Sequence, residues 1–131
     1  MEQNQLEPIM TVLARHPGIE MAILFGSMAT GRAGYDSDID LAVAAVQPIE
    51  LEEKMALMEA LAEVTGRPID LIDLTIVGEP LLGQILKRGK RILGTDEAYA
   101  KLIMRHLVDE ADFMPYYRRI LAERRQAWIG K

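Results

Sequence analysis

The chain has 131 residues and a formal net charge of −5, with 15 Lys and Arg against 20 Asp and Glu. This length fits one domain, and the acidic balance argues against a protein that binds duplex nucleic acid directly. The chain contains no Cys, which excludes disulfides and a cysteine nucleophile and favours a cytoplasmic location. The first ten residues lack Lys, Arg and an apolar run, so we expect no signal peptide. No stretch approaches the ~18 uninterrupted apolar residues that would span a bilayer, so we expect no membrane-spanning segment.

The first part of the chain alternates between helical and extended patterns. Apolar residues at helical spacing predict a helix over residues 6–13, which the His-Pro-Gly segment at 16–18 ends. The apolar run 21–25 is long enough for a buried strand. Small and turn-forming residues fill positions 26–37, and residues 38–45 predict a second strand.

A helix, a strand and another helix follow. Pro48 favours the start of a helix that ends at Gly66, and a stripe of apolar residues is predicted to lie on one face of this helix. The stripe comprises Leu51, Met55, Met58 and Leu61 or Ala62. Residues 69–74 predict a third strand, residues 81–88 a helix, and residues 92–94 an edge strand.

The remaining chain is predicted to be helical from residue 96 to about residue 128, with a kink or break at Pro115. Strands that alternate with helices favour an α/β (α+β) fold, with helices flanking one small mixed sheet. We expect a single domain over residues 1–131, with a core over about 1–94 and a C-terminal helical extension over about 95–131.

Two aspartates mark the start of the second predicted strand. In Asp38-Ile39-Asp40 the two carboxylates share one face of an extended segment, because successive side chains on a strand point to opposite faces. Adjacent carboxylates repel each other unless a cation lies between them, and carboxylate oxygens are ligands that Mg²⁺ prefers. The pair predicts a metal site, and the alternative is a solvated strand end.

The turn before this strand adds a candidate phosphate site. Gly26 lets the backbone approach a ligand, and the following amides together with the Ser27 hydroxyl can hold phosphate oxygens. On the third strand, Asp70 and Asp73 fall on opposite faces, so only one of them can join the carboxylates. Three carboxylates are enough for a two-metal phosphoryl-transfer site.

These residues together resemble a known superfamily. Gly26-Ser27, ten residues, Asp38-Ile39-Asp40 and a later Asp70 are similar to the nucleotidyltransferases related to DNA polymerase beta. The small size and residues 69–74 resemble the minimal nucleotidyltransferases, or MNT proteins. Residues 81–94 resemble the MNT antitoxins that are encoded beside HEPN-domain toxins. The resemblance covers roughly residues 20–94 and implies a polymerase beta-like fold.

The resemblance also implies roles for single residues. Asp38, Asp40 and Asp70 would be the catalytic and metal-binding residues, and Asp70 would help to activate the attacking hydroxyl. Gly26 and Ser27 would bind the nucleotide. The implied substrate is ATP and the implied cofactor is Mg²⁺, as two ions. A hydroxyl would attack the α-phosphate in line, and pyrophosphate would leave.

Several other polar residues are expected to lie outside this chemistry. Asp73 is predicted to be structural, since it faces away from the site if Asp70 faces it. Neither His16 nor His106 has a second His or Cys at ligand spacing, and no functional role is expected for them.

The function implied by the resemblance is that of an antitoxin which transfers AMP to a tyrosine of a HEPN ribonuclease toxin. Two alternatives stay open: an antitoxin that neutralises the toxin by binding alone, and a transferase acting on a small-molecule hydroxyl. Transferases that act on small molecules usually need a further domain to cover the acceptor. Only 37 residues follow residue 94, so this alternative ranks last. A set of residues is predicted to dock the partner unless the terminal helix packs onto the sheet. The set comprises Tyr116, Tyr117, Arg118 and Arg119. The sequence leaves a homo-oligomer open.

Overall fold

In the computed structural model, which describes residues 3–26 and 38–129, four strands form one mixed sheet. The strands are β1 (Ile19–Phe25), β2 (Ile39–Ala45), β3 (Ile69–Asp73) and β4 (Lys90–Leu93). Their order in the sheet is β3-β2-β1-β4. Strand β1 is antiparallel to both β2 and β4, whereas β2 and β3 are parallel. The prediction of a small mixed sheet is therefore confirmed.

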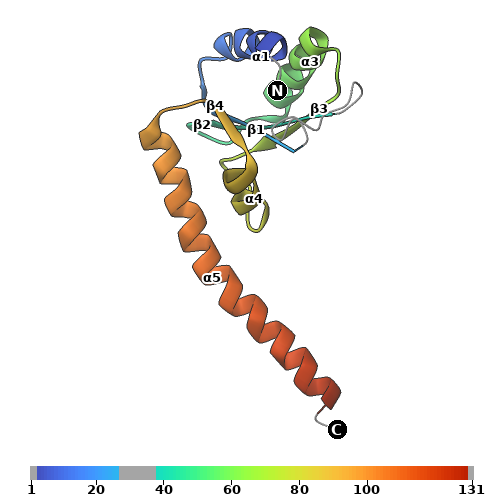
Figure 1. Cartoon of the computed structure of the whole chain (residues 1–131), viewed down its shortest axis with the longest axis vertical. Coiled ribbons are helices and arrows are strands. Elements are labelled where there is room, and N and C mark those ends of the chain that lie inside the picture. The colour runs from blue at the N-terminus through green and yellow to red at the C-terminus, as the bar shows by residue number, and fades with distance from the viewer. Residues whose placement is uncertain (1–2, 27–37, 130–131) are drawn as a thin grey trace.

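Helices cover both faces of this sheet. Helices α1 (Gln3–Ala14) and α3 (Leu51–Thr65) lie over one face, and α4 (Leu81–Arg88) lies over the other with the first turns of α5 (Asp96–Ile129) (Figure 1). Gly66 ends α3 with a φ of 69°, a left-handed conformation that glycine adopts without strain. The helix ends predicted at residues 16–18 and at Gly66 are thus confirmed.

The alternation of side chains along β2 divides the core into two layers. Ile39, Leu41 and Val43 are fully buried beneath α1 and α3. Ala42 points the other way and packs with α4 and α5 residues such as Leu82. Because Asp40 shares the parity of Ala42, its side chain projects from the face that α4 and α5 cover.

The face predicted for the α3 stripe is not the buried face of the helix in its first two turns. Leu51 is 70% exposed and Met55 is 61% exposed, whereas Leu57 and Leu61 are fully buried. Apolar residues occur around most of this helix, so the sequence offers more than one apolar stripe. Contact with α1 and β3 selects the stripe through Leu57 and Leu61.

The predicted break at Pro115 was wrong, because α5 is one continuous helix from Asp96 to Ile129; a kink at this position stays a prediction. A proline inside a helix leaves the carbonyl four residues earlier, here that of Ala111, without its partner. The distal part of α5 extends away from the sheet (Figure 1), and Ala111 is exposed, so water can satisfy this carbonyl. None of the helices in the described part of the chain combines the length and apolar character needed to cross a membrane.

Candidate active site

The parallel pairing of β2 and β3 places Asp40 directly beside Asp70, since their Cα atoms are register partners. The two side chains are close enough to share a hydrogen bond. Asp40 is half-buried and Asp70 is exposed. The structure therefore brings together two of the three carboxylates that the sequence singled out, at the edge where β2 and β3 begin.

The Asp40 carboxylate lies in an unfavourable environment for a negative charge. Burial raises the pKa of Asp40 above its ordinary value, and the charge of Asp70, the hydrogen bond with Asp70 and the charge of Asp38 raise it further. Repulsion of this kind is relieved when a cation binds between the carboxylates. The electrostatics of the pair thus favour a bound cation.

Gly26 brings the backbone against this pair. Phe25, the last residue of β1, pairs with Asp40, and Gly26 follows with a φ of 70°. A Cβ atom at Gly26 would collide with Oδ2 of Asp40 and would lie 3.0 Å from its Cγ. Both the conformation and the close approach therefore require glycine. Ser27, predicted to bind the nucleotide, lies outside the described residues.

Asp38 is exposed immediately before β2 and acts on Asp40 through its charge. Within residues 3–26 and 38–129, no three His, Cys, Asp or Glu side chains are gathered closely enough to hold a metal ion by themselves. Mg²⁺ usually takes one or two protein carboxylates and fills its remaining positions with water and substrate phosphates. The donor chemistry of Asp40 and Asp70 fits that pattern, and the role of Asp38 as a ligand stays a prediction.

Asp73 lies on the opposite face of β3 from Asp70, as predicted. Its side chain is buried, with 7% of the residue exposed. One carboxylate oxygen accepts a hydrogen bond from the amide of Ile49 at 2.9 Å, and the other accepts one from the amide of Thr75 at 2.8 Å. Asp73 therefore fixes the loops that follow β2 and β3.

Asp73→Ala is expected to lower the free energy of unfolding by about 2–4 kcal/mol, because two partly buried amides lose a charged acceptor. Urea unfolding measures this loss. The matched variant Asp70→Ala removes an exposed side chain and should not lower stability, because it also removes a charge that repels Asp40. The reverse ranking of the two variants would contradict the register of β3.

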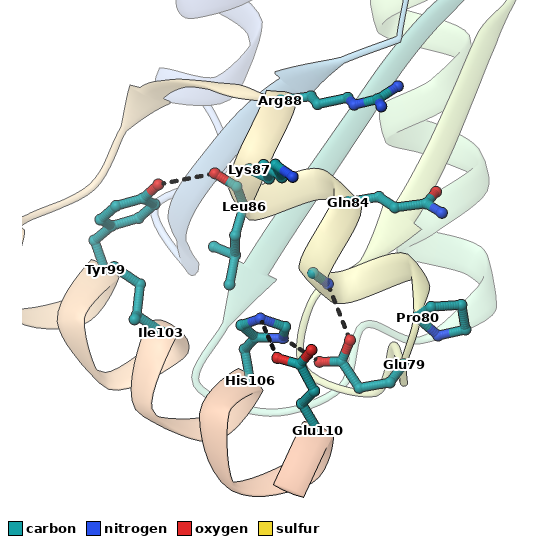
Figure 2. A pocket seen from close by; sticks show the side chains of 11 residues that line it. Glu79, Pro80, Gln84, Leu86, Lys87, Arg88, Tyr99, Ile103, His106 and Glu110 are labelled. Atoms are coloured by element: carbon teal, nitrogen blue, oxygen red, sulfur yellow. Dashed lines mark hydrogen bonds and ion pairs between the residues drawn. The ribbon is translucent and has the colours of Figure 1, made fainter. Parts of the chain in front are cut away.

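One group of residues with strong polar contacts was assigned no role by the sequence. His106 on α5 lies between Glu79 and Glu110, in a pocket between α4 and α5 (Figure 2). The four-residue spacing of His106 and Glu110 is visible in the sequence. The contact with Glu79 spans 27 positions and leaves no local signal.

Comparison with known proteins identifies relatives of the whole core. The family model described as Polymerase beta, Nucleotidyltransferase matches residues 7–98. The protein adenylyltransferase MntA of Shewanella oneidensis is 33% identical over 87 residues. That alignment covers 64% of this chain and 63% of the relative, so the chain spans less than two thirds of the length of MntA.

Two solved structures extend the likeness to most of the chain. A chain in the crystal structure of a toxin–antitoxin with AMP-PNP is 26% identical with a TM-score of 0.74, over 88% of this chain and 98% of the other. A chain in the structure of tri-AMPylated Shewanella oneidensis HEPN toxin with MNT antitoxin is 25% identical with a TM-score of 0.71. In that case 92% of this chain and 99% of the other are covered.

Proposed function

Since the chain belongs to the Polymerase beta nucleotidyltransferase family, we propose that it is an antitoxin that transfers AMP from ATP to a tyrosine hydroxyl of a partner HEPN toxin. The family membership and the fold predicted from the sequence are both confirmed. The observation that carries the proposal is the Asp40–Asp70 pair held against the backbone of Gly26. The likeness to MntA and to toxin–antitoxin structures supports the choice of acceptor.

In the proposed reaction, the acceptor oxygen forms a bond to the α-phosphorus while the bond to the β-phosphate oxygen breaks, and pyrophosphate leaves. Asp40 and Asp70 would hold Mg²⁺, which when bound supplies positive charge beside the reacting phosphate. Asp70 is exposed and can accept the proton of the attacking hydroxyl. Because the backbone at Gly26 approaches Asp40 closely, a phosphate bound at this turn would lie beside the carboxylates.

The position of α5 supports a protein acceptor. Asp40 and Asp70 project from the face of the sheet that α4 and the first turns of α5 cover. Helix α5 leaves the core on that same side (Figure 1). Helix α5 exposes several large apolar residues. They are Met104, Leu107 and Val108, at 59%, 52% and 55%, and Leu121 at 45%. Apolar surface on a projecting helix is typical of a partner-binding element.

The predicted docking residues lie further along α5. Arg118 and Arg119 are exposed, and the side chains of Tyr116 and Tyr117 lie outside the described residues. A partner that engages both parts of α5 would be held on the carboxylate side of the sheet. This arrangement favours an acceptor hydroxyl that belongs to a second protein over one that belongs to a bound small molecule.

Incubation of this protein with ATP, Mg²⁺ and its HEPN partner should add one or more AMP groups to the partner, as measured by intact-mass spectrometry. The control replaces ATP with α,β-methylene ATP, in which the bond to be broken is blocked, and no mass increase is expected. A toxin that is neutralised without modification would instead favour an antitoxin acting by binding alone. The absence of any complex would favour a small-molecule acceptor.

A further inference from the structure

Helix α5 is hydrogen-bonded to the loop between β3 and α4 through the guanidinium group of Arg105. Nη1 donates hydrogen bonds to the carbonyl oxygens of Leu74 at 2.6 Å and Thr75 at 3.3 Å. Nη2 donates to the carbonyl oxygen of Val77 at 2.9 Å. Three hydrogen bonds from one side chain therefore join α5 to a loop about 30 residues earlier in the chain.

The next residue, His106, makes a second polar contact with the segment between β3 and α4. Its Nδ1 lies 2.6 Å from Oε1 of Glu79, and its Nε2 lies 3.2 Å from Oε2 of Glu110 (Figure 2). The Glu79 side chain is only 6% exposed, and its other oxygen accepts a hydrogen bond from the amide of Gly83 at 3.1 Å. The imidazole therefore joins α5 to the first turn of α4 through a buried carboxylate.

Gly83 makes room for this contact. A Cβ atom there would lie 2.6 Å from Cε1 of His106 and 3.1 Å from Oε2 of Glu79. Glycine inside a helix lowers helical stability. Helix α4 thus has a weak helix former at the point where the imidazole ring approaches it.

Close packing alone does not fix the angle between α4 and α5. A cavity of about 550 Å³ lies between them, lined by residues of both helices including Leu86, Tyr99 and Ile103. Near its root α5 buries Leu102 in the core. The polar contacts of Arg105 and His106 come one turn later, where the helix begins to leave the core. They are placed to set the direction of the projecting part.

We infer that Arg105, His106 and Glu79 form a clamp that fixes the direction of α5, so that Arg105 and His106 are positioning residues for the protein acceptor. This inference rests on the proposed function, in which α5 carries the partner. Transfer depends on holding the acceptor hydroxyl in line with the α-phosphate, and small displacements there reduce rates strongly. The clamp controls that alignment without touching ATP.

The direction of α5 can be measured directly, because the chain has no Cys. Spin labels on Glu59→Cys in α3 and Arg124→Cys in α5, both exposed positions, report the distance between core and helix. Gly83→Ala should displace the imidazole ring and broaden the distance distribution, although alanine is the better helix former. The matched variant Gly78→Ala meets nothing within 4 Å and should leave the distribution unchanged. His106→Ala should resemble Gly83→Ala.

The same variants separate positioning from folding. Gly83→Ala and His106→Ala should keep the ATP affinity of the parent protein and lose about tenfold or more in AMP transfer to the toxin. Failure of the parent protein to transfer AMP would count against the proposed function, whereas the label distances decide the clamp in either case. Distance distributions identical to the parent in both variants would overturn the clamp.

Discussion

Asp40→Asn should abolish AMP transfer and yet raise the stability of the protein at neutral pH. The substitution removes one of two adjacent carboxylates proposed to hold Mg²⁺, so we expect transfer to fall by about 10³-fold or more. Asp70→Asn should have a similar effect on transfer. Intact-mass kinetics with the toxin measure the loss of transfer, and calorimetry with ATP and Mg²⁺ measures the loss of nucleotide binding. Retained transfer in both variants would place the chemistry elsewhere.

The gain in stability follows from the raised pKa of Asp40. When the pKa of a carboxyl group is higher in the folded than in the unfolded protein, its protonated form stabilises the fold. This stabilisation is complete at a pH below the pKa of the unfolded protein, and it is lost as the pH rises through the pKa of the folded protein. The ionised form of Asp40 therefore destabilises the folded protein. In urea unfolding at pH 7, the free energy of unfolding of Asp40→Asn should exceed that of the parent protein. The difference should shrink as the pH falls toward 3.8, the ordinary pKa of an aspartate. Glu59→Gln, at an exposed position of α3, is the control and should show no such trend.

The part of the site that depends on short-range pattern could be predicted from the sequence. Alternation along a strand separates Asp70 from Asp73, and the structure places the first beside Asp40 and buries the second. The strong β1–turn–β2 pattern located Gly26 at a strand end, where its left-handed conformation and close approach to Asp40 are found. In each case the signal lies within a few residues, and the strand geometry converts it into a position in space.

What the sequence did not predict depends on contacts between distant elements. The buried stripe of α3 is chosen by α1 and β3, which lie on either side of it in the chain. The clamp at His106 needs Glu79 and a missing side chain at Gly83, and neither is marked by local pattern. The continuity of α5 through Pro115 depends on the helix leaving the core, which the proline itself does not indicate.

Gly26→Ala should impair nucleotide binding and transfer far more than it impairs folding. The φ of 70° alone costs an alanine about 1 kcal/mol, which urea unfolding should detect. The new methyl group must also displace the Asp40 carboxylate, because no other arrangement relieves its overlap with Oδ2 without moving the strand. A carboxylate displaced by an ångström no longer pairs with Asp70 in the geometry that a metal and a phosphate require.

Gly66→Ala is the matched control for this prediction. Gly66 has a φ of 69°, almost the value of Gly26, but a Cβ atom there meets nothing within 4 Å. Both variants should therefore lose about 1 kcal/mol of stability from the left-handed conformation. Only Gly26→Ala should also lose ATP binding in the presence of Mg²⁺, as measured by calorimetry, and about 10²-fold in AMP transfer. Equal transfer by the two variants would mean that the contact between Gly26 and Asp40 does not contribute to transfer. The backbone strain that both positions share would then account for the whole loss of transfer.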